Sequence, residues 1–141
     1  MATQTTGGFD MRFDEELRTI IMTFHGVVTI DVNRDSNRAL LQKIEEMGVT
    51  EENPIHLIVD CSHVERLAYK VRELSESNKA MEDPRIFWAI IIVPPGFMGN
   101  IINLFATVVT QITQKRFRSF KTLDESVDFL KSPSNPFWQA Q

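Results

Sequence analysis

Four polar residues with the chemistry of a catalytic site follow an apolar run in the middle of the chain. The run Leu57–Val59 leads directly into Asp60, Cys61, Ser62 and His63. A cysteine can act as a nucleophile when its thiol lies within hydrogen-bond reach of a histidine and an oxyanion site faces the substrate. No nucleophile-elbow motif accompanies Cys61, and free cysteine is commonly buried. The sequence therefore favours a packed thiol over a hydrolase nucleophile, and it predicts no catalytic residue.

A second combination of residues has the composition of a metal site. His25, Asp60 and His63 could form a set of two histidines and one carboxylate. No two of them show the short spacing that is typical of metal ligands. A carboxylate in a loop would instead accept backbone N–H groups, and Ser62 would make a similar local turn. We therefore predict no metal and no cofactor, and we interpret residues 60–63 as a polar loop at a strand end.

Two further segments carry groups that attract anions. Residues 94–103, PPGFMGNIIN, place two glycines before an expected long helix, and helix N-termini bind anions through free N–H groups. The segment matches neither G-x-G-x-x-G nor a Walker pattern, so a tight strand-to-helix turn is the plainer interpretation. Residues 114–121, QKRFRSFK, gather four cations, which are weak support for a phosphate or anionic-lipid site on an acidic protein.

Composition excludes several classes of protein. The chain has 141 residues, 43% of them hydrophobic and 24% charged, which is typical of one globular domain. A formal net charge of −4 gives no reason to expect nucleic-acid binding. The single cysteine excludes an internal disulfide. We expect no signal peptide and no integral membrane segment, and we take a cytoplasmic location as the default.

Strands and helices alternate in the hydrophobic pattern. Strands are expected at 9–13, 17–25, 55–60, 85–93 and 117–120, and helices at about 29–48, 68–81, 98–115 and 122–130. The order β-β-α-β-α-β-α-β-α predicts an α/β fold with one mixed, mostly parallel five-stranded sheet and about four helices. The most apolar strand, 85–93, is expected at the sheet centre. We divide the chain into a flexible N-terminus (1–8), a domain (9–131) and a C-terminal tail (132–141).

The expected helix at 98–115 has an apolar arc wider than one sheet face needs. Ile102, Ala106 and Val109 lie beside its core stripe, and Phe137 and Trp138 in the tail could cover such a patch. A wide arc is consistent with deeper burial. It is equally consistent with a partner surface, so these five residues form a predicted protein or homodimer interface.

The order of four segments resembles the STAS superfamily, in its SpoIIAA-like branch that is often grouped with SEC14-like domains. The segments are MTFHGVVTID, LIVDCSHVE, FWAIIIVPP and RFRSFKTLDESVDFL. The resemblance implies a regulatory switch module, in which a strand-end D-x-S precedes a serine pair that a kinase phosphorylates. Asp60 and Ser62 match the D-x-S, but about Tyr69 and Lys70 stand at the serine-pair positions. The phosphorylation switch is therefore not implied here, whereas relatives that bind lipids or small ligands remain relevant.

These observations place the predicted ligand site at the carboxyl edge of a parallel sheet, where three strand ends converge. His56, at the start of its strand, is expected at the opposite edge. We predict a non-enzymatic regulatory module that acts through a protein partner or a homodimer. The alternative is a binder of a small apolar or lipid-like molecule. The residues predicted to line its site are His25, Asp60, Ser62, His63, Gly96, Phe97 and Asn100.

Overall fold

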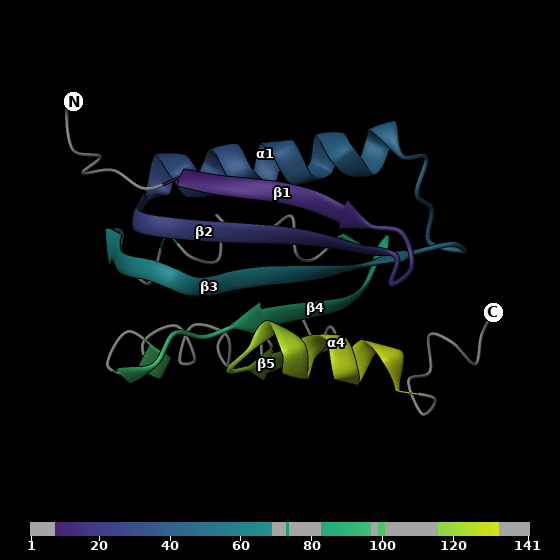
Figure 1. The fold of residues 1–141 in the computed structure, drawn as a ribbon. Coiled ribbons are helices and arrows are strands. Elements are labelled where there is room, and N and C mark those ends of the chain that lie inside the picture. Colours follow the sequence, from purple (N-terminus) through teal and green to yellow (C-terminus); the bar gives the residue numbers. More distant parts are fainter. Residues whose placement is uncertain (1–7, 69–72, 74–82, 97–98, 101–115, 133–141) are drawn as a thin grey trace.

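The structure, a computed structural model, describes residues 8–68, 73, 83–96, 99–100 and 116–132. Five strands form one sheet in the order β1-β2-β3-β4-β5, in which β1 and β2 are antiparallel and the other neighbours are parallel (Figure 1). The mixed five-stranded sheet is therefore confirmed. The elements are β1 (Gly8–Asp14), β2 (Thr19–Thr29), α1 (Ile30–Glu46), β3 (Ile55–Ala68), β4 (Ile86–Ile92), β5 (Phe117–Phe120) and α4 (Leu123–Lys131).

The strand register aligns distant parts of the chain. Thr23 of β2 pairs with Asp60 of β3, Asp60 pairs with Ile92 of β4, and Ile92 pairs with Phe120 of β5. The carboxyl ends of β4 and β5 therefore lie level with the middle of β2 and β3. This row of pairs brings the segments that follow β4 and β5 together at one edge of the sheet.

Two strands extend beyond the predicted ends. The sequence predicts that β2 stops at Gly26 and that β3 stops at Asp60, but β2 continues to Thr29 and β3 to Ala68. Gly26 has φ 72°, a value that commonly marks a turn. Here it lies beside register shifts, so its backbone bends the strand without ending it. The prediction that residues 60–63 form a strand-end loop is therefore wrong.

Two hydrophobic layers cover the sheet. On one face, Leu40 and Ile44 of α1 pack with Ile20, Leu57 and Cys61. The other face carries a separate cluster that includes Ile58, Ile90 and Leu130 and that packs against α4. Figure 1 shows α1 and α4 on different sides of the sheet. The amino half of β3 is buried from both sides, as its lack of alternation predicts.

The helix caps follow the sequence closely. The Thr29 side chain accepts a hydrogen bond from the Val32 N–H at the start of α1, and Asp31 lies in its first turn. Thr122 and Glu125 form a capping box that opens α4. Both features are short-range patterns, so they can be recognised without the tertiary structure.

Other predictions about the elements need correction. Among the described residues there are two helices, α1 and α4, whereas the sequence predicts about four. The order of the described elements therefore differs from the predicted alternation of strands and helices. Most of the predicted helices at 68–81 and 98–115 lies outside the described residues, but Ala68 belongs to β3. The sheet centre is β3, not β4. Strand β4 is apolar because it is an interior strand that contributes to the clusters on both faces.

Candidate functional site

Asp60 is engaged by its own neighbour within β3. It is 8% exposed, and its Oδ1 atom accepts hydrogen bonds from the Ser62 backbone N–H at 2.9 Å and the Ser62 hydroxyl at 2.6 Å. At this point the strand pairing is irregular, because two residues of β3, Cys61 and Ser62, lie opposite one residue of β2, Phe24. An extra residue leaves backbone groups outside the regular ladder. The carboxylate therefore satisfies one such N–H group and stabilises the bulge.

Cys61 lies among apolar side chains on the α1 face of the sheet. It is 7% exposed. Burial, together with the negative charge of Asp60, raises the pKa of its thiol to about 12. The reactive form of cysteine is the thiolate, so at neutral pH this side chain is a packed thiol and a poor nucleophile.

His25 and His63 are brought together by the sheet register. They pair between β2 and β3, and His63 is exposed. The Nε2 atom of His25 lies 3.6 Å from Asp10 Oδ2, with the two side chains 51% and 84% exposed, respectively. Ion pairs this exposed contribute little to stability. Among the described residues, no group of three histidine, cysteine or acidic side chains is placed to hold a metal ion.

His56 occupies the opposite edge, as predicted. It pairs with Thr19 at the start of β2 and is fully buried. Its ring makes an edge contact with Phe87, with centroids 5.9 Å apart. Burial, together with the charges of Arg18 and Arg116, lowers the pKa of His56 to about 3. The imidazole is therefore neutral at physiological pH.

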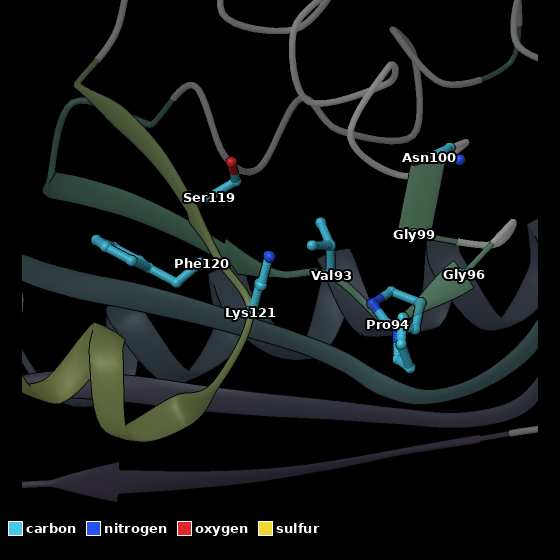
Figure 2. Close-up of a pocket in the computed structure, with 9 residues that line it drawn as sticks. Val93, Pro94, Gly96, Gly99, Asn100, Ser119, Phe120 and Lys121 are labelled. Atoms are coloured by element: carbon cyan, nitrogen blue, oxygen red, sulfur yellow. The ribbon is translucent and has the colours of Figure 1, made fainter.

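A cavity opens beyond the carboxyl ends of β4 and β5 (Figure 2). Its volume is about 710 Å³. One wall is the segment that follows β4, and the other is the end of β5 with the residue after it. The lining residues are Val93, Pro94, Pro95, Gly96, Gly99, Asn100, Ser119, Phe120 and Lys121.

The first wall depends on a tight turn. Gly96 has φ 76°, which disfavours a side chain there. A Cβ atom on Gly99 would overlap the Pro94 carbonyl oxygen. Gly99 therefore lies close against the Pro94 carbonyl group, and only glycine at position 99 allows this approach without movement of the backbone.

The second wall is held by hydrogen bonds at the start of α4. The Val93 N–H donates to the Phe120 carbonyl oxygen at 2.9 Å, which joins the two walls. The N–H groups of Lys121 and Thr122 donate to Glu125 Oε1 at 3.1 and 3.2 Å. The capping box of α4 therefore also positions the backbone of Lys121.

The cavity agrees with only part of the predicted ligand site. Gly96 and Asn100 line it, whereas four predicted residues belong to β2 and β3 and do not: His25, Asp60, Ser62 and His63. Ser119 and Lys121 were missed. The basic run QKRFRSFK was a signal for Lys121, but the sequence alone does not bring this run to the segment after β4. Outside the described residues lie predicted Phe97 and the predicted interface residues Ile102, Ala106, Val109, Phe137 and Trp138.

Comparisons with known proteins concern the fold. The sequence matches no protein-family model and no curated protein. An uncharacterised protein from Shewanella loihica, described as having a SpoIIAA-like fold, superposes with a TM-score of 0.63 at 13% identity over 92% of this chain and 98% of that one. An anti-sigma factor antagonist from Mycobacterium paratuberculosis gives a TM-score of 0.59 at 13% identity over 94% of this chain and 100% of that one. The chain therefore has the SpoIIAA-like fold that its resemblance to the STAS superfamily implied.

Proposed function

We propose that the protein is a non-enzymatic regulatory module that binds a protein partner at the carboxyl edge of β4 and β5. The observation that carries this proposal is the open cavity between the segment after β4 and the end of β5. Ligands of open α/β sheets bind beyond the carboxyl ends of the strands. A protein partner is supported by the solved structure of the same fold that is described as an anti-sigma factor antagonist, a description that names a protein target.

The chemistry of the cavity supports binding over catalysis. Its described lining includes Ser119 and Lys121 but no histidine, cysteine or acidic residue that could serve as a general base for the Ser119 hydroxyl. Cys61 lies in the α1-side core instead. A cytoplasmic location stays a prediction. Within the described residues, no helix combines the length and apolar character needed to cross a bilayer.

The described surface favours a polar contact with the partner. Leu41, at 37% exposure, is the one exposed large hydrophobic side chain among the described residues. Partner surfaces with few exposed apolar groups are typical of transient complexes, whereas obligate dimers have more hydrophobic interfaces. If the partner is a second copy, size-exclusion chromatography with light scattering will detect a dimer, and a strict monomer at high concentration would exclude the homodimer.

Site-specific photo-crosslinking tests the protein-partner proposal. A photoreactive amino acid replaces Asn100, which lines the cavity and is exposed. The matched control carries it at Arg38, whose side chain is 76% exposed on α1 and does not line the cavity. We expect a discrete protein adduct in cells from position 100 and none from position 38. The same adducts from both positions, or none from position 100, would contradict the proposal.

A small ligand is the second candidate for the cavity. The observation that favours it is the volume of about 710 Å³, which lies within the roughly 300–1,000 Å³ of small-molecule sites. Native mass spectrometry of the purified protein tests this candidate. We expect a retained or added small molecule at one equivalent, and binding that a bulky Asn100→Trp substitution weakens. Equal binding by that variant would place the ligand elsewhere.

A further inference from the structure

We propose that the cavity binds a small organic anion and that Lys121 holds its anionic oxygens. This inference rests on the second candidate function, the small-ligand site, and adds the chemical class of the ligand. It starts from charge. Lys121 is the one charged side chain among the described lining residues, which include no carboxylate. A cation without an acidic neighbour in a concave site attracts an anionic ligand.

The ammonium group of Lys121 is not committed elsewhere in the described structure. It takes part in none of the five ion pairs found among the described residues. Asp124 and Glu125 are the acidic residues that follow Lys121 in the chain, and Glu125 is the one whose carboxylate contacts the backbone of Lys121. The Glu125 Oε1 atom already accepts the N–H groups of Lys121 and Thr122 and lies 3.4 Å from the Thr122 hydroxyl. Glu125 therefore serves the helix cap.

Two other cations of this region that the structure describes, Arg116 and Arg118, lie over aromatic rings. The Cζ atom of Arg116 lies 3.5 Å from the centroid of the Phe87 ring, and its Nε–H donates to the Phe87 carbonyl oxygen at 3.0 Å. The Cζ atom of Arg118 lies 5.1 Å from the Trp88 ring centroid. Such cation–π contacts fix a guanidinium over its ring. Of these three cations, Lys121 is the one that lines the cavity.

The second wall presents polar side chains to the cavity. Ser119, near the end of β5, and Lys121, in the bend that follows the strand, are both exposed, whereas Phe120 between them is half-buried. Phe120 packs on Phe129, with ring centroids 5.4 Å apart. Figure 2 shows the Phe120 ring pointing away from the Lys121 ammonium group. The Ser119 hydroxyl, the Lys121 ammonium and the Asn100 amide are the polar side-chain groups of the lining.

The remaining lining is apolar and defines the rest of the ligand. Val93, Pro94 and Pro95 supply hydrocarbon surface beside these polar groups. A mixed lining of this kind fits a molecule with an anionic head and a short apolar body, such as a carboxylate or a phosphate ester. The head group would take hydrogen bonds and charge from the second wall. The body would contact the proline-rich first wall.

Titration of the full chain with three probes tests the inference. The probes are hexanoate, the neutral analogue hexanol and inorganic phosphate, and binding is followed by two-dimensional amide NMR. Hexanoate should shift the amides of Gly96, Gly99 and Ser119. Lys121→Gln should weaken hexanoate binding about fivefold, the upper range for a solvent-exposed ion pair. Lys121→Arg should retain binding, and about 0.5 M salt should abolish the difference between wild type and Lys121→Gln.

Lys131→Gln is the matched control, because Lys131 is an exposed lysine at the end of α4 that does not line the cavity. It should bind hexanoate like the wild type. Phosphate binding that depends on Lys121 would also support the inference, and it would show that an anionic group binds without an apolar body. Equal binding of hexanoate and hexanol, unchanged by Lys121→Gln, would overturn the anion site and leave the small-ligand function intact. Failure of all three probes to bind would overturn both.

Discussion

His56 and His63 are histidines of the same strand in opposite surroundings. His56 is fully buried at the start of β3, close enough to Arg18 and Arg116 for their charges to lower its pKa, whereas His63 is exposed beyond the last β4 pair. The folded protein holds the His56 imidazole neutral because a buried charge beside two guanidinium groups is unfavourable. This residue should therefore affect stability and not binding.

We expect His56 to make the fold sensitive to acid. Its pKa is about 3 in the folded protein against 6.5 for an unperturbed histidine, so the unfolded chain binds the proton first as the pH falls. The free energy of unfolding should therefore drop as the pH falls from about 6.5 toward 3. Between pH 7 and pH 4.5 the loss from this group should be about 1–3 kcal/mol. Urea unfolding at both pH values measures it.

The loss of stability in the wild type is compared with the loss in two variants. His56→Leu should lose less stability than the wild type over the same pH interval, because carboxylates titrate in both proteins and cancel in the difference. His63→Leu, which changes an exposed histidine, should behave like the wild type. An identical loss in wild type and His56→Leu would show that His56 has no part in the acid sensitivity.

At the scale of elements, the cavity depends on how β4 and β5 end. After β4, Gly99 lies close against the Pro94 carbonyl oxygen, and the segment after β5 is held by the α4 capping box. The Val93–Phe120 hydrogen bond connects them. The capping box could be read from the sequence, because its partners are three residues apart. The bond between Val93 and Phe120 could not, because it needs the parallel pairing of β4 with β5.

Gly99→Ala should destabilise the protein more than a glycine substitution in open space. The added methyl group would overlap the backbone of Pro94, which forces the turn to move at a cost of at least about 2 kcal/mol. Gly48→Ala is the control. Gly48 has φ 67° and open space around its Cβ position, so only backbone strain of about 1 kcal/mol is expected. Urea unfolding compares the two, and equal losses would contradict the tight turn.

At the scale of the whole molecule, β3 has two different halves. From Ile55 to Asp60 it pairs with β2 on one side and β4 on the other, within the two hydrophobic layers. Beyond Asp60 its described pairing is with β2 alone. The two strands therefore continue as a ribbon past the ends of β4 and β5, as Figure 1 shows.

Hydrogen exchange should separate these halves. Backbone amides of Leu57–Val59 should exchange at least about tenfold more slowly than those of Glu65–Leu67, because the first group opens only when the central sheet opens. NMR measurement of amide exchange in the native protein provides the test. Similar protection in the two segments would mean that the whole strand opens as one unit.

Local sequence patterns determined much of this fold. The Thr29 and Thr122 caps, strand 117–120 and the two-sided burial of residues 55–60 follow from contacts within a few residues or from the hydrophobic pattern. The tertiary structure alone decided that residues 60–63 belong to a strand. A polar run after an apolar strand predicts a loop until pairing between β2 and β3 supplies hydrogen bonds for both backbones. It also decided that Lys121, and not His25 or Asp60, faces the cavity, because register between strands is set by the packed sheet and not by neighbours in the chain.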